Sequence, residues 1–229
     1  MRNWKLTTAC LVFVSGSLAP AQGTFQNLDF ESPNVANLTN LFVAFSDAFP
    51  GWTGYVGTNQ ATGAGYNFIS GGAALTSLVT PTAPGGGGAV VINGNYSAAL
   101  VTGETGPVGG TIVPVAIAQT ALIPISARSL RFSASANVNY LVVMFSCVTV
   151  PFSAVGVGPN YTIYAGDIQP FAGLTGELRF TEQAASFGPG LILDDIQFSN
   201  ISIPEPNVTS LAVLAALLLG WPFFRRRRR

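Results

Sequence analysis

The sequence predicts an all-β protein: an antiparallel β-sandwich of jelly-roll type, with an N-terminal signal peptide and a single C-terminal transmembrane helix. Three observations predict this class. Short segments rich in β-branched and aromatic residues recur between residues 22 and 202, separated by Gly, Pro and Asn. No long segment in that region repeats its apolar residues with helical spacing. An apolar run flanked by basic residues, as in a signal peptide or a membrane span, occurs only near the two ends of the chain.

Ten segments are the candidate strands of the sandwich. In order they are TFQNLDF, LFVAFSDAF, AALTSLV, AVVING, TIVPVAIAQTALI, RSLRFSASA, YLVVMFSCVTV, YTIYAG, GELRFTEQ and LILDDIQFSNI. In RSLRFSASA, Leu130 and Phe132 alternate with polar residues, which predicts one face toward the core and one toward water. YLVVMFSCVTV is apolar on both faces, so we expect a central strand with Cys147 as a small buried residue. A barrel or a short β-solenoid is the alternative architecture.

Charged side chains are scarce and unevenly distributed. They make up 9% of the 229 residues, against about 25% in an ordinary globular protein. From residue 22 to residue 206, three arginines stand against ten acidic residues, a net charge of −7. Because affinity for nucleic acid comes largely from neutralising phosphates, this composition argues against a nucleic-acid partner.

The first 21 residues have the three parts of a secretory signal peptide. Arg2 and Lys5 form a basic start, an apolar run follows, and Ala19 and Ala21 supply the small residues that signal peptidase needs. Cleavage after Ala21 leaves residues 22–202 as the exported domain. An uncleaved anchor or a buried N-terminal strand is the alternative.

The C-terminal segment combines an uncharged run with a basic end. Residues 208–224 carry no charge, and as a helix they would be about 25 Å long, near the lower limit for crossing a bilayer. Five arginines follow and should hold the C-terminus in the cytoplasm, with the domain in the periplasm. They are Arg225, Arg226, Arg227, Arg228 and Arg229. A buried core helix would be a poor alternative, because these charges could not follow it inside.

Pro204, Glu205 and Pro206 directly precede this run. Their order with the apolar span and the arginine cluster, over residues 203–229, resembles the PEP-CTERM sorting signal. The resemblance implies a Gram-negative bacterium whose exosortase, a membrane-embedded transpeptidase-like cysteine enzyme, recognises and cleaves the tail. The two prolines also favour an extended backbone around Glu205 without regular hydrogen bonding, which an enzyme could reach.

Several kinds of catalysis are excluded by residue content. The chain has no histidine, and its only lysine lies within the signal peptide. A Ser-His-Asp or Cys-His system therefore cannot be built, nor can a zinc site of His and Cys ligands or a lysine-containing phosphate loop. A pair of carboxylates, as in a glycoside hydrolase, is the remaining catalytic alternative. No spacing singles out such a pair, so we expect a protein without enzymatic activity and name no catalytic residue.

Two acidic pairs lie at the ends of the domain and are candidate ligands of a structural Ca²⁺. Asp29 and Glu31 occur in NLDFES, and Asp194 and Asp195 occur in LILDDIQFS. If the first and last strands lie close together, carboxylates from both could share one ion, because Ca²⁺ prefers oxygen ligands. Successive residues of a strand point to opposite faces, so only one of Asp194 and Asp195 should reach it. A polar strand edge without metal is the alternative.

The same segments, together with FPGWTGY, are similar to galactose-binding-like jelly rolls, a fold that several carbohydrate-binding modules share. This resemblance implies that Trp52 and Tyr55 stack on a sugar ring; the alternative for Trp52 is a place in the core. We therefore expect an exported protein of the cell surface or extracellular matrix with a structural or adhesive role. It would pass through the inner membrane, with signal peptidase and exosortase as processing partners. The alternatives are a carbohydrate-binding module for extracellular polysaccharide and a two-carboxylate hydrolase.

Overall fold

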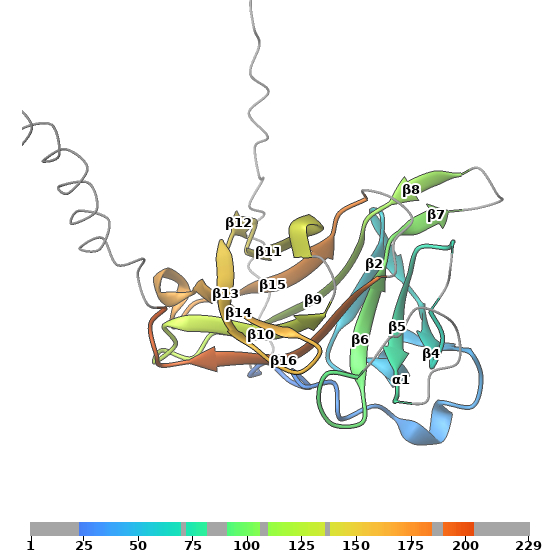
Figure 1. Cartoon of the computed structure of the whole chain (residues 1–229), viewed down its shortest axis with the longest axis horizontal. Coiled ribbons are helices and arrows are strands. Elements are labelled where there is room, and N and C mark those ends of the chain that lie inside the picture. Colours follow the sequence, from blue (N-terminus) through green and yellow to red (C-terminus); the bar gives the residue numbers. More distant parts are fainter. Residues whose placement is uncertain are drawn as a thin grey trace, which may run out of the picture.

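The computed structural model describes residues 23–69, 72–81, 91–105, 110–135, 138–184 and 190–203. They form a β-sandwich of two large sheets, which confirms the predicted all-β class (Figure 1). The predicted signal peptide, the glycine-rich residues 82–90 and the tail from residue 204 onward lie outside the described residues. Among the residues described, no helix is both long enough and apolar enough to cross a bilayer.

The larger sheet has eight strands. In spatial order they are β1 (Phe42–Ala44), β4 (Gly63–Tyr66), β5 (Leu75–Val79), β6 (Ser97–Val101), β16 (Leu191–Ser199), β10 (Ser129–Ser135), β14 (Thr162–Asp167) and β13 (Phe152–Val157). Neighbouring strands are antiparallel except β4 and β5, which run parallel. The last strand of the chain, β16, is therefore central, with β6 on one side and β10 on the other.

The second sheet has six strands, and a short hairpin extends from the sandwich. The six strands are β12 (Val148–Thr149), β11 (Leu141–Phe145), β15 (Thr175–Glu182), β9 (Val115–Leu122), β2 (Thr53–Val56) and β3 (Asn59–Ala61). The hairpin consists of β7 (Gly103–Thr105) and β8 (Thr111–Val113). The helices are α1 (Phe45–Ala48) and the 3₁₀ turns η1 (Val35–Asn37), η2 (Val138–Tyr140) and η3 (Gln169–Phe171).

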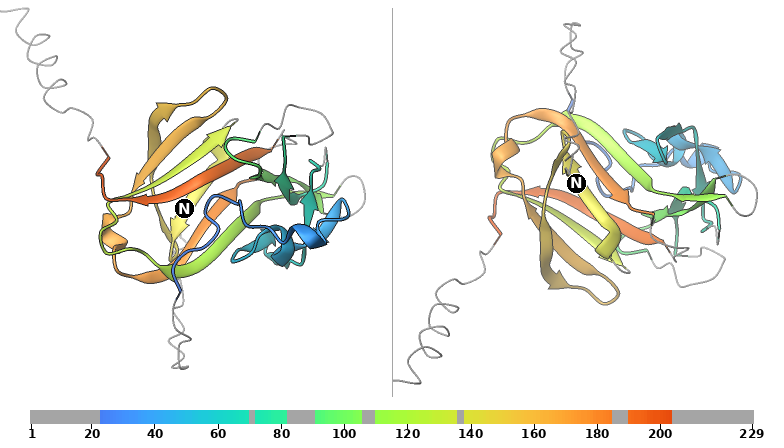
Figure 2. Two further views of the ribbon diagram at one scale, coloured as in Figure 1. Left: turned by 90° about the horizontal axis from the view of Figure 1, so that it is seen from below. Right: turned by 90° about the horizontal axis from the view of Figure 1, so that it is seen from above.

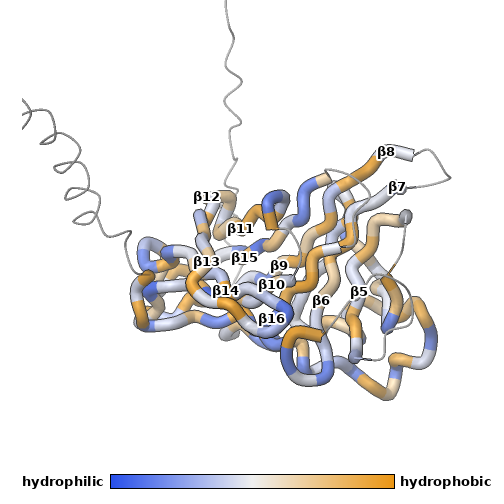
Figure 3. The backbone as a smooth tube through the Cα atoms, in the orientation of Figure 1, coloured by the Kyte–Doolittle hydropathy of each residue, from blue (hydrophilic) through white to orange (hydrophobic). Residues whose placement is uncertain are grey.

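The core lies between the two large sheets and is rich in aromatic side chains. Phe132 of the larger sheet meets Phe180 of the smaller one edge to face, with ring centroids 5.4 Å apart. Along β15, inward Leu178 and Phe180 are fully buried, while outward Glu177 and Arg179 are partly exposed. This period-two pattern follows from the pleat of a strand with one face toward the core. Figure 3 shows polar and apolar residues alternating along much of the chain.

The expected central strand YLVVMFSCVTV is instead a hairpin at the edge of the smaller sheet. Ser146 and Cys147 have positive φ angles of 46° and 68°, and Phe145 pairs with Val148 across them. Two left-handed residues between paired strands form a tight hairpin turn, which reverses the chain after β11. Cys147 is consequently exposed rather than buried.

Several other expected boundaries also differ from the structure. Pro114 divides TIVPVAIAQTALI into β8 and β9, since proline has no N–H to donate to a ladder. TFQNLDF contributes only an isolated bridge at Thr24 and then turns at Asn27 and Phe30, whose φ angles are 49° and 57°. The described part of AVVING, residues 91–94, is a loop rather than a strand.

The described chain leaves the sandwich at the end opposite the β7–β8 hairpin. In Figure 1 the C-terminal red segment lies at the left and the hairpin at the upper right, and both views of Figure 2 agree. This end is built from the start of β10, the end of β14 and the end of β16, because Ser129 pairs with both Asp167 and Ser199.

Candidate functional site

The acidic residue Glu31 binds the loop that leads into β6. Its Oε1 accepts hydrogen bonds from the backbone N–H groups of Asn95 and Tyr96, each at 2.8 Å. Its Oε2 accepts a third from Nδ2 of Asn95, at 3.1 Å. Between these contacts Gly94 has a φ angle of +66°, and a Cβ added there would collide with Glu31 Oε1. The segment before the first strand therefore fixes the conformation of a loop more than 60 residues later.

Asp194 holds the same loop from the other side. It is only 1% exposed, on the outer face of the larger sheet. Its Oδ2 accepts hydrogen bonds from the Ser97 hydroxyl at 2.7 Å and the Asn93 backbone N–H at 3.2 Å. Burial raises the pKa of Asp194 to about 7, although the hydrogen bond from Ser97 acts in the opposite direction. A buried carboxyl thus joins the central strand β16 to the loop.

Asp195 reaches this loop because the strand is irregular at that position. Its φ angle is +48°, and the register between β10 and β16 shifts between Arg131 and Ser133. The Asp195 backbone N–H donates to Asp194 Oδ1 at 2.7 Å, and Asp195 Oδ1 accepts from Asn93 Nδ2 at 3.3 Å. A regular strand would send the two side chains to opposite faces; here both bind Asn93.

The acidic residues of the first and last segments therefore converge on one loop, but not on one another. Asp29 Oδ1 accepts from the backbone N–H of Glu31, at 3.3 Å. Within the part of the chain that the structure describes, no three Asp, Glu, Cys or His side chains gather in a metal-binding arrangement. N–H and O–H donors point at the carboxylate oxygens of Glu31 and Asp194. In this arrangement the four candidate ligands do not fit a calcium ion; they are Asp29, Glu31, Asp194 and Asp195.

Trp52, the first expected sugar-stacking residue, lies in the core. It is 5% exposed, its ring centroid is 5.7 Å from that of Phe30 and 6.5 Å from that of Phe180, and its Nε1–H donates to the carbonyl of Asn27 at 2.9 Å. Residue 52 precedes β2 and continues its inward face, where Gly54 is also buried. The ring is therefore enclosed by protein and does not form a platform for a sugar.

Tyr55 lies on the outer face of the smaller sheet, where an arginine covers its ring. Arg179 Cζ is 4.0 Å from the ring centroid, and Arg179 Nε donates to Glu177 Oε1 at 2.8 Å. Strand β9 lies between β2, which carries Tyr55, and β15, which carries Arg179. Its small residues Ala116 and Ala118 leave room for the guanidinium to lie over the sheet surface and reach the Tyr55 ring. Sequence reasoning missed this Tyr–Arg–Glu group. The signal was present in GELRF, where Glu177 and Arg179 are two residues apart on one strand face.

Glu182 is a second feature that sequence reasoning missed. It is the last residue of β15 and is 9% exposed, and burial raises its pKa to about 7. No hydrogen-bond donor among the described residues meets its Oε2. In GELRFTEQ the alternation that turns Leu178 and Phe180 inward also turns Glu182 inward, so the pattern could have identified it.

Two other carboxylates, those of Asp47 and Asp167, accept hydrogen bonds from residues close to them in the sequence. Asp47 Oδ1 accepts from the side-chain amides of Asn34 and Asn37, at 3.1 and 3.0 Å. Asp167 Oδ1 accepts from the backbone N–H of Gln169, at 2.9 Å. These contacts are typical of turn and loop stabilisation.

The remaining predicted functional residues lie outside the described residues. They are Ala19 and Ala21 of the signal cleavage site, Pro204, Glu205 and Pro206 of the sorting motif, and the arginines from Arg225 to Arg229. The described chain ends one residue before the motif, at Ile203.

Comparison with known proteins gives no family assignment. No protein-family model and no curated protein matches the chain. Among solved structures, an apo form cyclase from Fischerella sp. is similar with a TM-score of 0.44 and 11% identity, over 76% of this chain and 93% of that one. The enzymatically active domain of bacteriophage CBA120 tailspike protein 4 is similar with a TM-score of 0.36 and 15% identity, over 75% of this chain and 21% of that one. Similarities this distant carry no argument about activity.

Proposed function

We propose that this protein is an exported, non-catalytic β-sandwich that exosortase delivers to the cell surface or the extracellular polysaccharide matrix of a Gram-negative bacterium. The observation that carries the proposal is the order of three elements after residue 203: Pro204-Glu205-Pro206, the uncharged residues 208–224 and the arginine cluster. In this proposal residues 1–21 are a cleaved signal peptide and residues 208–224 form a transmembrane helix. The domain is a jelly-roll-like sandwich with a structural or adhesive role.

The position of the motif relative to the fold supports this proposal. Strand β16 ends at Ser199, and the hydrogen bond from the Ser129 hydroxyl to the carbonyl of Ile201, 2.7 Å long, is among the last contacts of the domain. Cleavage at the Pro-Glu-Pro motif would take no strand from either sheet. A processing signal requires this separation, because its removal must leave the exported domain folded.

The buried and covered aromatics favour a structural role over sugar binding. Trp52 is enclosed in the core, and the Arg179 guanidinium lies over the ring of Tyr55. Sugar rings are bound by aromatic faces that are open to solvent, so neither residue supports the carbohydrate-binding alternative in this conformation.

Substitution of Pro204, Glu205 and Pro206 by alanine tests the sorting proposal. In a host with exosortase, we expect the variant to remain at full length in the inner membrane, while the wild type reaches the exterior without its tail. Intact-mass measurement of both pools distinguishes the two forms. Pro170→Ala, at an exposed proline of the domain, is the control and should be processed like the wild type. Exported wild-type protein that still contains Arg225 to Arg229 would contradict the proposal.

A further inference from the structure

Three segments meet at the end of the sandwich where the chain leaves it. Ile123 and Leu174 are joined by a backbone hydrogen bond of 3.0 Å, and Ile123 also accepts one from Gly173. A Cβ built on Gly173 would lie 3.5 Å from Ile125 Cδ1, so residues 123–125 and 173–174 are in contact. On the other side of the same turn, the Arg128 N–H donates to the carbonyl of Ser199 at 2.7 Å, which brings in the C-terminal segment.

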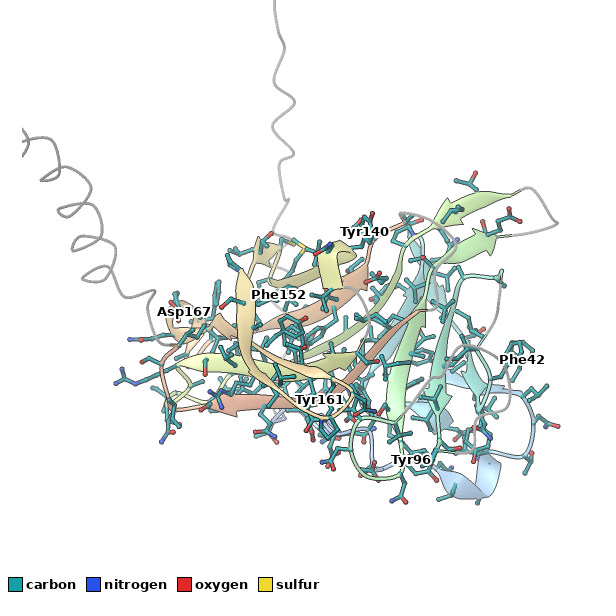
Figure 4. The ribbon with its side chains drawn as sticks, in the orientation of Figure 1. Phe42, Tyr96, Tyr140, Phe152, Tyr161 and Asp167 are labelled. Atoms are coloured by element: carbon teal, nitrogen blue, oxygen red, sulfur yellow. The ribbon has the colours of Figure 1, made fainter. Side chains whose placement is uncertain are left out.

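This end exposes aliphatic side chains that the fold does not cover. Ile125 is 87% exposed, Leu174 52% and Ile201 61%. We call these three residues the exit patch. The red C-terminal segment leaves the domain at this end in Figures 1 and 2, and Asp167, which pairs with Ser129 at the start of β10, marks the same end in Figure 4.

Charge is nearly absent around the exit patch. Residues 124–128, 167–174 and 200–202 contain only Arg128 and Asp167 as charged residues. Exposed apolar side chains with so few charges beside them are typical of surfaces that contact a membrane or another protein.

The length of the following chain limits what can lie against this end. Four residues separate Ile203 from Val208, where the proposed transmembrane helix begins. A fully extended chain over those five steps reaches about 17 Å. While the tail is inserted, the exit end must therefore face the bilayer at close range. Strand β13 begins near the exit end, at Phe152, and ends at Val157, which is 82% exposed. Val157 is therefore directed away from the bilayer.

We propose that the exit patch docks on the phospholipid surface of the inner membrane while the tail is inserted. Ile125, Leu174 and Ile201 would enter the interfacial region, where aliphatic side chains are stabilised by leaving water. Docking would hold Pro204, Glu205 and Pro206 against the membrane surface, where a membrane-embedded enzyme can reach them. This inference rests on the proposed function, because it requires the span at residues 208–224.

The test uses the full mature chain in vesicles of phosphatidylethanolamine and phosphatidylglycerol. In a Cys147→Ser background, Ile125→Cys, Leu174→Cys and Val157→Cys each carry an environment-sensitive fluorophore, and the vesicles contain a nitroxide-labelled lipid. Val157 is the matched control, since its exposure is close to that of Ile125. We expect blue-shifted emission at 125 and 174, with lipid quenching at least about threefold stronger than at 157.

Carbonate extraction of the same vesicles measures insertion of the tail separately. Suppose the chain resists extraction, but the fluorophores at 125, 174 and 157 all emit as in water and are quenched equally by the lipid. Docking is then refuted and the proposed membrane span stands. If carbonate removes the chain, the span and the docking proposal fall together. Strong quenching at 125 but not at 174 would also overturn docking, because the two residues belong to one surface.

Discussion

The carboxyl group of Glu182 is buried, so its contribution to the free energy of unfolding depends on whether it is protonated. Its Oε2 has no donor among the described residues, and burial raises its pKa to about 7 from the usual 4.5. In the unfolded chain the carboxyl ionises in water at the lower value. The folded state binds this proton more tightly, so the contribution of Glu182 to stability is fully present below pH 4.5 and is lost as the pH rises through about 7.

Substitution Glu182→Gln should therefore flatten the pH dependence of stability. We expect the free energy of unfolding of the wild type to fall between pH 5 and pH 8, with Glu182 contributing on the order of 2 kcal/mol. The variant should lose that contribution and keep the part due to Asp194, whose pKa burial also raises. Urea unfolding at several pH values measures the slope. The exposed Asp167→Asn serves as control, and identical slopes for Glu182→Gln and the wild type would contradict the argument.

At the scale of elements, the loop of residues 93–96 depends on side chains from the first and last segments of the domain. Glu31 supplies three acceptor contacts to it, and Asp194 and Asp195 supply the contacts to Asn93. Ile92 and Ile192 pack in a small apolar cluster on the same outer face of the sheet, with Val79, Ala99 and Val101. The loop thus covers a second core, which explains why strand β6 is buried on both faces.

Removing the Glu31 carboxylate should loosen this loop without unfolding the sandwich. For Glu31→Ala we expect a loss of about 1 to 3 kcal/mol in stability and faster hydrogen exchange at the amides of Asn95 and Tyr96. Glu31→Gln keeps one acceptor oxygen and should lie between the variant and the wild type. Asp29→Ala is the control, because among the described residues the Asp29 carboxylate accepts from the Glu31 backbone N–H and has no hydrogen bond to the loop. Unchanged exchange at both amides in Glu31→Ala would show that the contacts do not hold the loop.

Sequence predicted the elements well where alternation was long and poorly where a turn lay inside an apolar run. GELRFTEQ became β15 because eight residues of consistent alternation leave one solution for the buried face. LILDDIQF became β16, but its sequence did not show that residues 191–194 are buried on both faces or that the strand is irregular at Asp195. YLVVMFSCVTV could not be divided from its composition, since Ser146 and Cys147 are not residues that usually mark a left-handed turn. Strands such as β6, with small residues buried on both faces, carry little periodic signal.

The candidate site was predicted in part for similar reasons. That Glu31 and Asp194 would lie in one region followed from expecting the chain ends to meet. These carboxylates bind a backbone loop rather than a cation, and that outcome depended on the left-handed conformations of Gly94 and Asp195. The Asn93-Gly94 pair favours such a turn, but no local pattern indicates the conformation of Asp195. The resemblance implied open rings for Trp52 and Tyr55, with a core position as the alternative for Trp52. The structure has Trp52 in the core, because exposure is set by neighbours elsewhere in the fold, here Phe30 for Trp52 and Arg179 for Tyr55.

For the whole molecule, the described sandwich should be independent of the tail. A chain ending at Ile203 is expected to melt at the same temperature as the full mature chain in the same detergent, because both sheets are complete by Ser199. A chain ending at Asp195 should fail to fold, since it lacks buried Ile196 and half of the β10–β16 pairing. Circular dichroism against temperature measures both. A large drop in melting temperature on removal of residues 204–229 would contradict the separation of domain and tail.

The central position of β16 also bears on the order of events in the proposed export. Strands β10 and β6 are joined only through β16, which is synthesised last, so the larger sheet cannot close until residue 199 is available. Such long-range pairing delays folding until the whole segment is available. The chain would therefore pass through the translocation channel unfolded and complete its sheet only when the proposed stop sequence, nine residues further on, has arrived. In the proposed export, the domain therefore cannot finish folding before the proposed sorting tail is next to cross.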